Sequence, residues 1–120
     1  MTPLEEIARL LAKHGHTSQA LAIHSLAARE EMRVELDGFW ADLAGPELFG
    51  PTASVASLEL GGESAAPTPA LERDRASFRR ALWLVADDLS LRGVASDESE
   101  VWRAKLRALT PRKPSADQNG

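Results

Sequence analysis

Three histidines are the side chains of this chain that could bind a metal ion or transfer a proton near neutral pH. His14 and His16 flank a glycine, and His24 follows in the same half of the chain. A metal site needs three or four ligands, and no acidic residue has a spacing that would complete this pair. The Glu-x-x-His pair of helical di-metal proteins is absent. We therefore predict no metal site and no cofactor.

Adjacent carboxylates occur at Glu30-Glu31 and at Asp87-Asp88. Neighbouring residues on a helix point about 100° apart, so neither pair can share one catalytic site. The motifs G-x-S-x-G and H-E-x-x-H do not occur, and Gly61-Gly62 lacks the lysine of a phosphate-binding loop. We predict that the chain is not an enzyme.

Trp83 is the strongest candidate for contact with another protein. It shares one predicted helix face with Arg79 and Asp87, and an exposed tryptophan flanked by charges is typical of an interface anchor. The alternative is that Trp83 packs against the central segment of the chain. Trp40 and Trp102 lie beside apolar stripes and are predicted to belong to the core or its margin.

The elements that would position these residues are helices. Thr2-Pro3 and Thr68-Pro69 are typical helix starts, Ser96 is a third, and Gly15 and Gly93 follow predicted helix ends. The predicted helices cover residues 3–14, 17–44, 69–92 and 97–110. The second either spans the molecule or bends near residues 37–38. We expect one all-α domain, residues 1–110, built as a bundle of four to five helices, and a disordered tail, residues 111–120.

Apolar residues recur at spacings of three and four along the last three predicted helices. The expected core stripe of the second helix is Leu21, Ser25, Ala28, Met32, Leu36, Phe39 and Leu43. The expected stripe of the third is Leu71, Phe78, Leu82, Val85 and Leu89, and that of the last is Val101, Trp102, Leu106 and Leu109.

The central segment, residues 46–68, is irregular but still apolar. We expect it to be partly ordered, from about Leu48 to Leu60, and packed on the bundle. Ser54 can cap one helical turn, whereas the alternation at Leu58-Glu59-Leu60 equally fits a short strand.

Part of this segment, Phe49 to Leu58, resembles a group of small helical bacterial proteins of unknown function, some of which resemble immunity proteins encoded beside toxins. Those proteins carry an aromatic-Gly-Gly-Met-Gly-Ser-Leu-Asn-Asp segment between helices. Gly50 and Ser54 match it, whereas Pro51, Ala53 and Ser57 do not. The resemblance implies an interaction or inhibitor role, with Phe49, Gly50 and Ser54 in the contact region, and it supplies no catalytic residue.

Charge is distributed unevenly between the two halves of the chain. Residues 1–60 contain nine acidic and four basic side chains, whereas residues 61–120 contain nine and ten. An acidic surface disfavours nucleic acid and favours a basic protein partner. The alternative is a regulator that touches nucleic acid through a basic run near the C-terminus, formed by Arg103, Lys105, Arg107, Arg112 and Lys113.

The leading hypothesis is a small module that binds another protein, with an immunity protein neutralising a basic toxin as its specific form. No apolar run approaches the roughly 18 residues of a membrane span, and Glu5 and Glu6 stand where a signal peptide carries positive charge. We therefore expect a cytoplasmic protein that does not enter a membrane. The sequence leaves its oligomeric state open.

Overall fold

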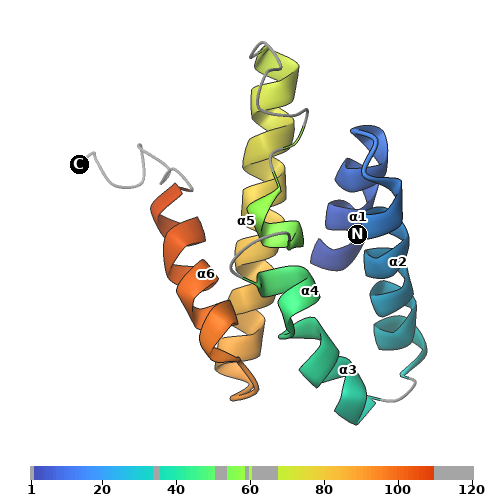
Figure 1. The fold of residues 1–120 in the computed structure, drawn as a ribbon, viewed down its shortest axis with the longest axis vertical. Coiled ribbons are helices and arrows are strands. Elements are labelled where there is room, and N and C mark those ends of the chain that lie inside the picture. Colours follow the sequence, from blue (N-terminus) through green and yellow to red (C-terminus); the bar gives the residue numbers. More distant parts are fainter. Residues whose placement is uncertain (1, 34–35, 51–53, 59, 61–67, 110–120) are drawn as a thin grey trace.

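The computed structural model describes residues 2–33, 36–50, 54–58, 60 and 68–109. Every regular element in these ranges is helical, so the predicted all-α fold is confirmed (Figure 1). One hydrophobic cluster receives side chains from all of these elements. Within the described part of the chain, no helix combines the length and the apolar character needed to cross a bilayer. The predicted tail lies outside the described residues.

Helices α1 (Pro3–Lys13) and α2 (Thr17–Met32) pack side by side as an antiparallel pair. Thr2 caps α1 as predicted, because its hydroxyl accepts the backbone N–H of Glu5 while the Glu5 carboxylate accepts the N–H of Thr2. Gly15 ends the helix with φ of 86°, a left-handed conformation that favours glycine. Both ends of α1 are therefore encoded locally.

Helix α2 ends at Met32, and a separate helix, α3 (Leu36–Leu43), follows it. Neither a continuous helix over residues 17–44 nor a bend near residues 37–38 is found. Instead, Arg33 adopts a left-handed conformation with φ of 56° and ends α2, while Gly38 lies inside α3. The apolar periodicity runs past this break because α3 also carries buried residues, Phe39 and Leu43. Periodicity alone therefore did not reveal the helix end.

The buried face of α2 also differs from the predicted stripe. Leu21 and Met32 are 63% and 70% exposed, and Ser25 between them is exposed. The residues that enter the core are Ala20, Ile23, Leu26 and Ala27. The reason lies in the composition of α2, which has apolar side chains on more than one face.

The central segment contains α4 (Pro46–Phe49) and the 3₁₀ turn η1 (Val55–Ser57). Leu60 is also buried, so the expectation of an ordered segment is confirmed for its described residues. The alternative of a strand at Leu58-Glu59-Leu60 is not supported by the described residues, Leu58 and Leu60. The Leu60 carbonyl accepts a hydrogen bond from a side chain, Arg75 Nε at 3.0 Å, and not from a neighbouring strand.

Helix α5 (Pro69–Leu91) runs through the middle of the molecule, with α1 against one side and α6 (Asp97–Leu109) against another (Figure 1). The Thr68 hydroxyl caps α5 by accepting the N–H of Leu71 at 3.1 Å. Its complete predicted stripe is buried: Leu71, Phe78, Leu82, Val85 and Leu89. This prediction is confirmed.

Helix α6 begins at the predicted cap, where the Ser96 hydroxyl accepts the N–H of Ser99 at 3.1 Å. The same hydroxyl donates to the carbonyl of Ala44 at 2.6 Å, which ties the start of α6 to the end of α3. Only part of the predicted stripe is correct, since Leu106 is buried but Val101 and Leu109 are exposed.

Candidate binding surfaces

The interaction residues predicted from the central segment lie inside the molecule. Phe49, Gly50 and Ser54 are buried, so a partner cannot reach their side chains without rearrangement. The Ser54 hydroxyl donates to the Gly50 carbonyl at 2.7 Å, and Trp102 Nε1 donates to the same oxygen at 2.9 Å. The expectation that these residues contact a partner is therefore replaced by a structural role, in which Gly50 joins α4, η1 and α6.

Glycine at position 50 is required by a close backbone approach. Its N–H donates to the Pro46 carbonyl at 2.9 Å and closes α4. A Cβ atom at this position would lie 2.5 Å from that carbonyl oxygen, which is shorter than any normal contact. The two residues that match the bacterial group, Gly50 and Ser54, are thus residues that shape the central segment.

Trp83 lies on the side of α5 that faces α6 and is partly buried against the hydrophobic core. Its ring is half-buried, with the Arg107 guanidinium 6.0 Å from the ring centre. Asp87, one turn further along α5, pairs with Arg103 of α6 at 2.7 Å. Hydrogen bonding to Asp87 raises the pKa of Arg103 above its ordinary value. Trp83 and Asp87 therefore hold α6 against α5.

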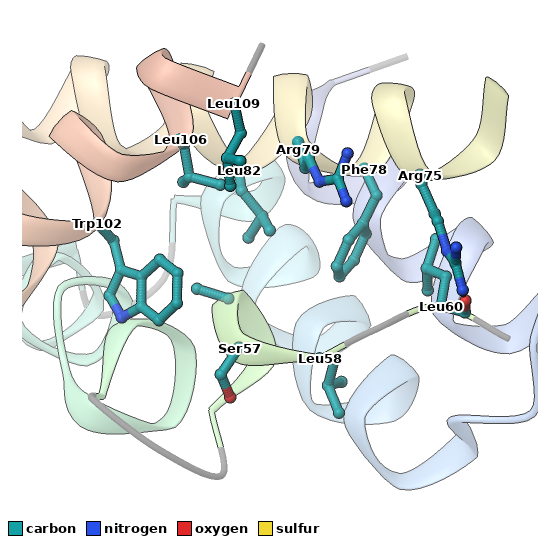
Figure 2. Close-up of a pocket in the computed structure, with 11 residues that line it drawn as sticks. Ser57, Leu58, Leu60, Arg75, Phe78, Arg79, Leu82, Trp102, Leu106 and Leu109 are labelled. Atoms are coloured by element: carbon teal, nitrogen blue, oxygen red, sulfur yellow. The ribbon is translucent and has the colours of Figure 1, made fainter. Parts of the chain in front are cut away.

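Arg79, the third member of the predicted patch, also lies on the side of α5 that faces α6. It lines a pocket of about 190 Å³ between α5, α6 and η1 (Figure 2). The apolar walls of this pocket include Ala56, Leu58, Phe78, Leu82, Trp102 and Leu106. Arg75, also in the wall, donates to the Leu60 carbonyl, whereas half-buried Arg79 has no ion pair or hydrogen bond among the described residues.

A second candidate surface is the exposed face of α2, which we call the outer stripe. It is defined by four residues at helical spacings of four, three and four: Leu21, Ser25, Ala28 and Met32. These spacings place all four on one side of the helix. The sequence pattern marked them as core, and only the packing of α2 shows that they face outward.

Among the described residues, the histidines form no cluster of three possible metal ligands. His14 Nε2 and Lys13 Nζ each lie 2.9 Å from the same carboxylate oxygen of Asp74, so they join α1 to α5. The hydrogen bonds from Lys13 and His14 lower the pKa of Asp74. Across the described ranges, no three histidine, cysteine or acidic side chains come together as a metal site.

Basic residues of α6 are engaged within the fold. Arg103 pairs with Asp87, Lys105 Nζ lies 4.8 Å from the ring centre of Trp102, and Arg107 lies over Trp83. Arg112 and Lys113 lie outside the described residues. Lys105 and Arg107 nevertheless remain exposed, and the nucleic-acid alternative stays a prediction.

Comparison with protein-family models, with curated proteins and with solved structures finds no match to this chain. The two surfaces that stand out are the outer stripe of α2 and the pocket beside Arg79.

Proposed function

We propose that the chain is a protein-binding module and that the outer stripe of α2 is its contact surface. The observation that carries this proposal is the exposure of Leu21 and Met32 on one helix face. Leu21 and Met32 lie about three turns apart on this face, and apolar residues repeated along one helix face are typical of a helix that binds a groove or another helix. No described element of the chain covers them.

The partner we propose is a basic protein with an apolar patch. The outer stripe belongs to the acidic half of the chain, residues 1–60, and charge complementarity speeds encounter with a basic surface. The specific form of the proposal is an immunity protein that neutralises a toxin in the bacterial cytoplasm. The resemblance around Gly50 and Ser54 supports this form.

Co-expression with the product of each adjacent gene, followed by purification, tests the proposal. We expect one neighbour to co-purify and to be toxic without this chain. The double substitution Leu21→Asp and Met32→Asp should weaken that complex at least tenfold, since it places charge in an apolar contact. Both sites are exposed, so the melting temperature should change little.

Leu91→Asp is the matched control, because Leu91 is 78% exposed at the end of α5 and lies outside the outer stripe. This control should bind like the wild type. The proposal fails when no neighbour binds, or when the double variant binds and protects cells as the wild type does. A wild-type dimer that the double variant dissociates would identify a second copy as the occupant and contradict the toxin form.

A further inference from the structure

We infer that the pocket between α5, α6 and η1 binds a small carboxylic acid with an apolar body, whose carboxylate faces Arg79. The inference does not depend on the proposed function, because the pocket contains no residue of the outer stripe. Figure 2 shows Arg79 beside Phe78 on α5, with Trp102 and Leu106 entering from α6.

The charge of the pocket selects an anion. Arg79 is half-buried and has no anionic partner among the described residues, whereas Arg103 of α6 pairs with Asp87. No carboxylate occurs among the described residues of the wall, and its other guanidinium, that of Arg75, already donates to the Leu60 carbonyl and lies 4.0 Å from the Glu72 carboxylate. A partly desolvated, unpaired guanidinium next to apolar walls is stabilised by a carboxylate, which it can bind through two parallel hydrogen bonds.

The neutral polar groups of the wall are already occupied. The Ser57 hydroxyl donates to the Ser54 carbonyl at 2.8 Å, and Trp102 Nε1 donates to the Gly50 carbonyl. The apolar side chains of the wall include Phe78, Leu82 and Leu106, which are buried. A ligand therefore gains one charged contact at Arg79 and places its apolar body against these side chains.

The volume of the pocket limits the size of the ligand. An apolar cavity of about 150 Å³ holds one benzene molecule, and pockets for drug-sized ligands start at about 300 Å³. At about 190 Å³, this pocket fits a body of roughly six to eight carbon atoms. We therefore commit to a small free acid of the size of phenylacetate or hexanoate, rather than to a folded protein surface.

Titration of the ¹⁵N-labelled full chain with phenylacetate tests the inference. Phenylacetamide has the same body without charge, and acetate has the charge without the body. We expect the indole signal of Trp102, which lines the pocket, to shift with phenylacetate and hexanoate. The indole signal of Trp40, which is not in the wall, should stay in place. Phenylacetamide and acetate should each bind about tenfold more weakly or not at all.

The variant Arg79→Gln should lower the affinity for phenylacetate about tenfold and leave the weak binding of phenylacetamide unchanged. Arg80→Gln is the matched control, because Arg80 is exposed on the same helix and lies outside this wall. That control should bind phenylacetate like the wild type. Melting curves of both variants check that the fold is intact.

Three results would overturn the inference. The first is that neither acid shifts the Trp102 signal of the wild type. The second is that phenylacetamide binds as tightly as phenylacetate, or that Arg79→Gln has no effect, because the site would then be merely apolar. The third is that only a peptide with a C-terminal phenylalanine binds, which would make the occupant a protein terminus.

Discussion

Helix α5 and helix α2 differ in how closely burial follows the apolar pattern of the sequence. In α5 the predicted stripe, from Leu71 to Leu89, is buried throughout, and charged residues occupy eight of the other eighteen positions. In α2 the predicted stripe is exposed at Leu21 and Met32, while Ile23 and Leu26 enter the core. Both helices are well formed, so the difference concerns orientation and not secondary structure.

The composition of α2 explains why its orientation could not be predicted. Residues 20–23 read Ala-Leu-Ala-Ile, so consecutive positions point apolar side chains in all directions around the helix. Such a helix has two faces suited to packing, and the partners available within the chain decide which one is buried. A face that is apolar and left uncovered is then free for another molecule.

The largest effect should come from residues that the two helices bury. Ile23→Ala in α2 and Leu82→Ala in α5 each remove a fully buried side chain and should lower the free energy of unfolding by about 2–5 kcal/mol. Leu21→Ala, two residues from Ile23, should change it by no more than about 0.5 kcal/mol. Urea denaturation of the three variants measures this. A loss at Leu21 as large as that at Ile23 would remove the contrast between the two faces of α2.

Trp83→Ala tests whether α5 uses a second face in packing. The ring is half-buried beneath Arg107, so its truncation should lower the free energy of unfolding by about 2 kcal/mol, less than for a fully buried tryptophan. Trp83→Phe keeps an aromatic ring and should lose less. Denaturation midpoints give both values. A midpoint for Trp83→Ala equal to that of the wild type would show that the Trp83 side chain is on the open surface and does not contribute to packing.

The smallest effect should come from the link between α1 and α5 at Asp74. Because Lys13 and His14 lower its pKa, the ionised Asp74 stabilises the folded chain at pH values above the ordinary aspartate pKa of about 3.9. This contribution disappears as the pH falls through the lowered pKa. Asp74→Asn should therefore melt slightly below the wild type at neutral pH, and the two curves should converge in acid.

The control for this prediction is Asp88→Asn, which removes an exposed carboxylate paired with Arg92 on the same helix. Exposed pairs of this kind contribute little, so its melting temperature should match that of the wild type at both pH values. A gap between Asp74→Asn and the wild type that persists in strong acid would show that the charge of Asp74 is not its cause.

Residue types and local spacing predicted the helices, their caps and the buried stripe of α5, because these depend on neighbours within a few turns. The surroundings of Arg79, Trp83 and Asp87 could not be predicted in this way. The three residues lie at intervals of four on one helix, and all three face α6: Trp83 and Asp87 contact it, and Arg79 lines the pocket whose wall includes residues of α6. The packing of α6 against this face turns the predicted patch inward, and no local spacing encodes that packing.

The central segment also contains contacts that the sequence did not predict. Its sequence singled out Gly50 and Ser54, and both are important, but as interior residues and not as contacts for a partner. Position 50 requires glycine because a Cβ atom there would approach the Pro46 carbonyl, and the Ser54 hydroxyl donates a hydrogen bond to the Gly50 carbonyl. Both contacts depend on how the chain turns after α4, which the sequence alone did not specify.

The orientation of α2 is the central claim, and cysteine labelling tests it most directly. The chain contains no cysteine, so Leu21→Cys, Met32→Cys and Ile23→Cys each introduce a single thiol. Thiols at positions 21 and 32 should react with a small maleimide in the folded protein as fast as in urea, whereas the thiol at position 23 should react only on unfolding. Rapid labelling at position 23 with protection at positions 21 and 32 would show that α2 packs by the opposite face.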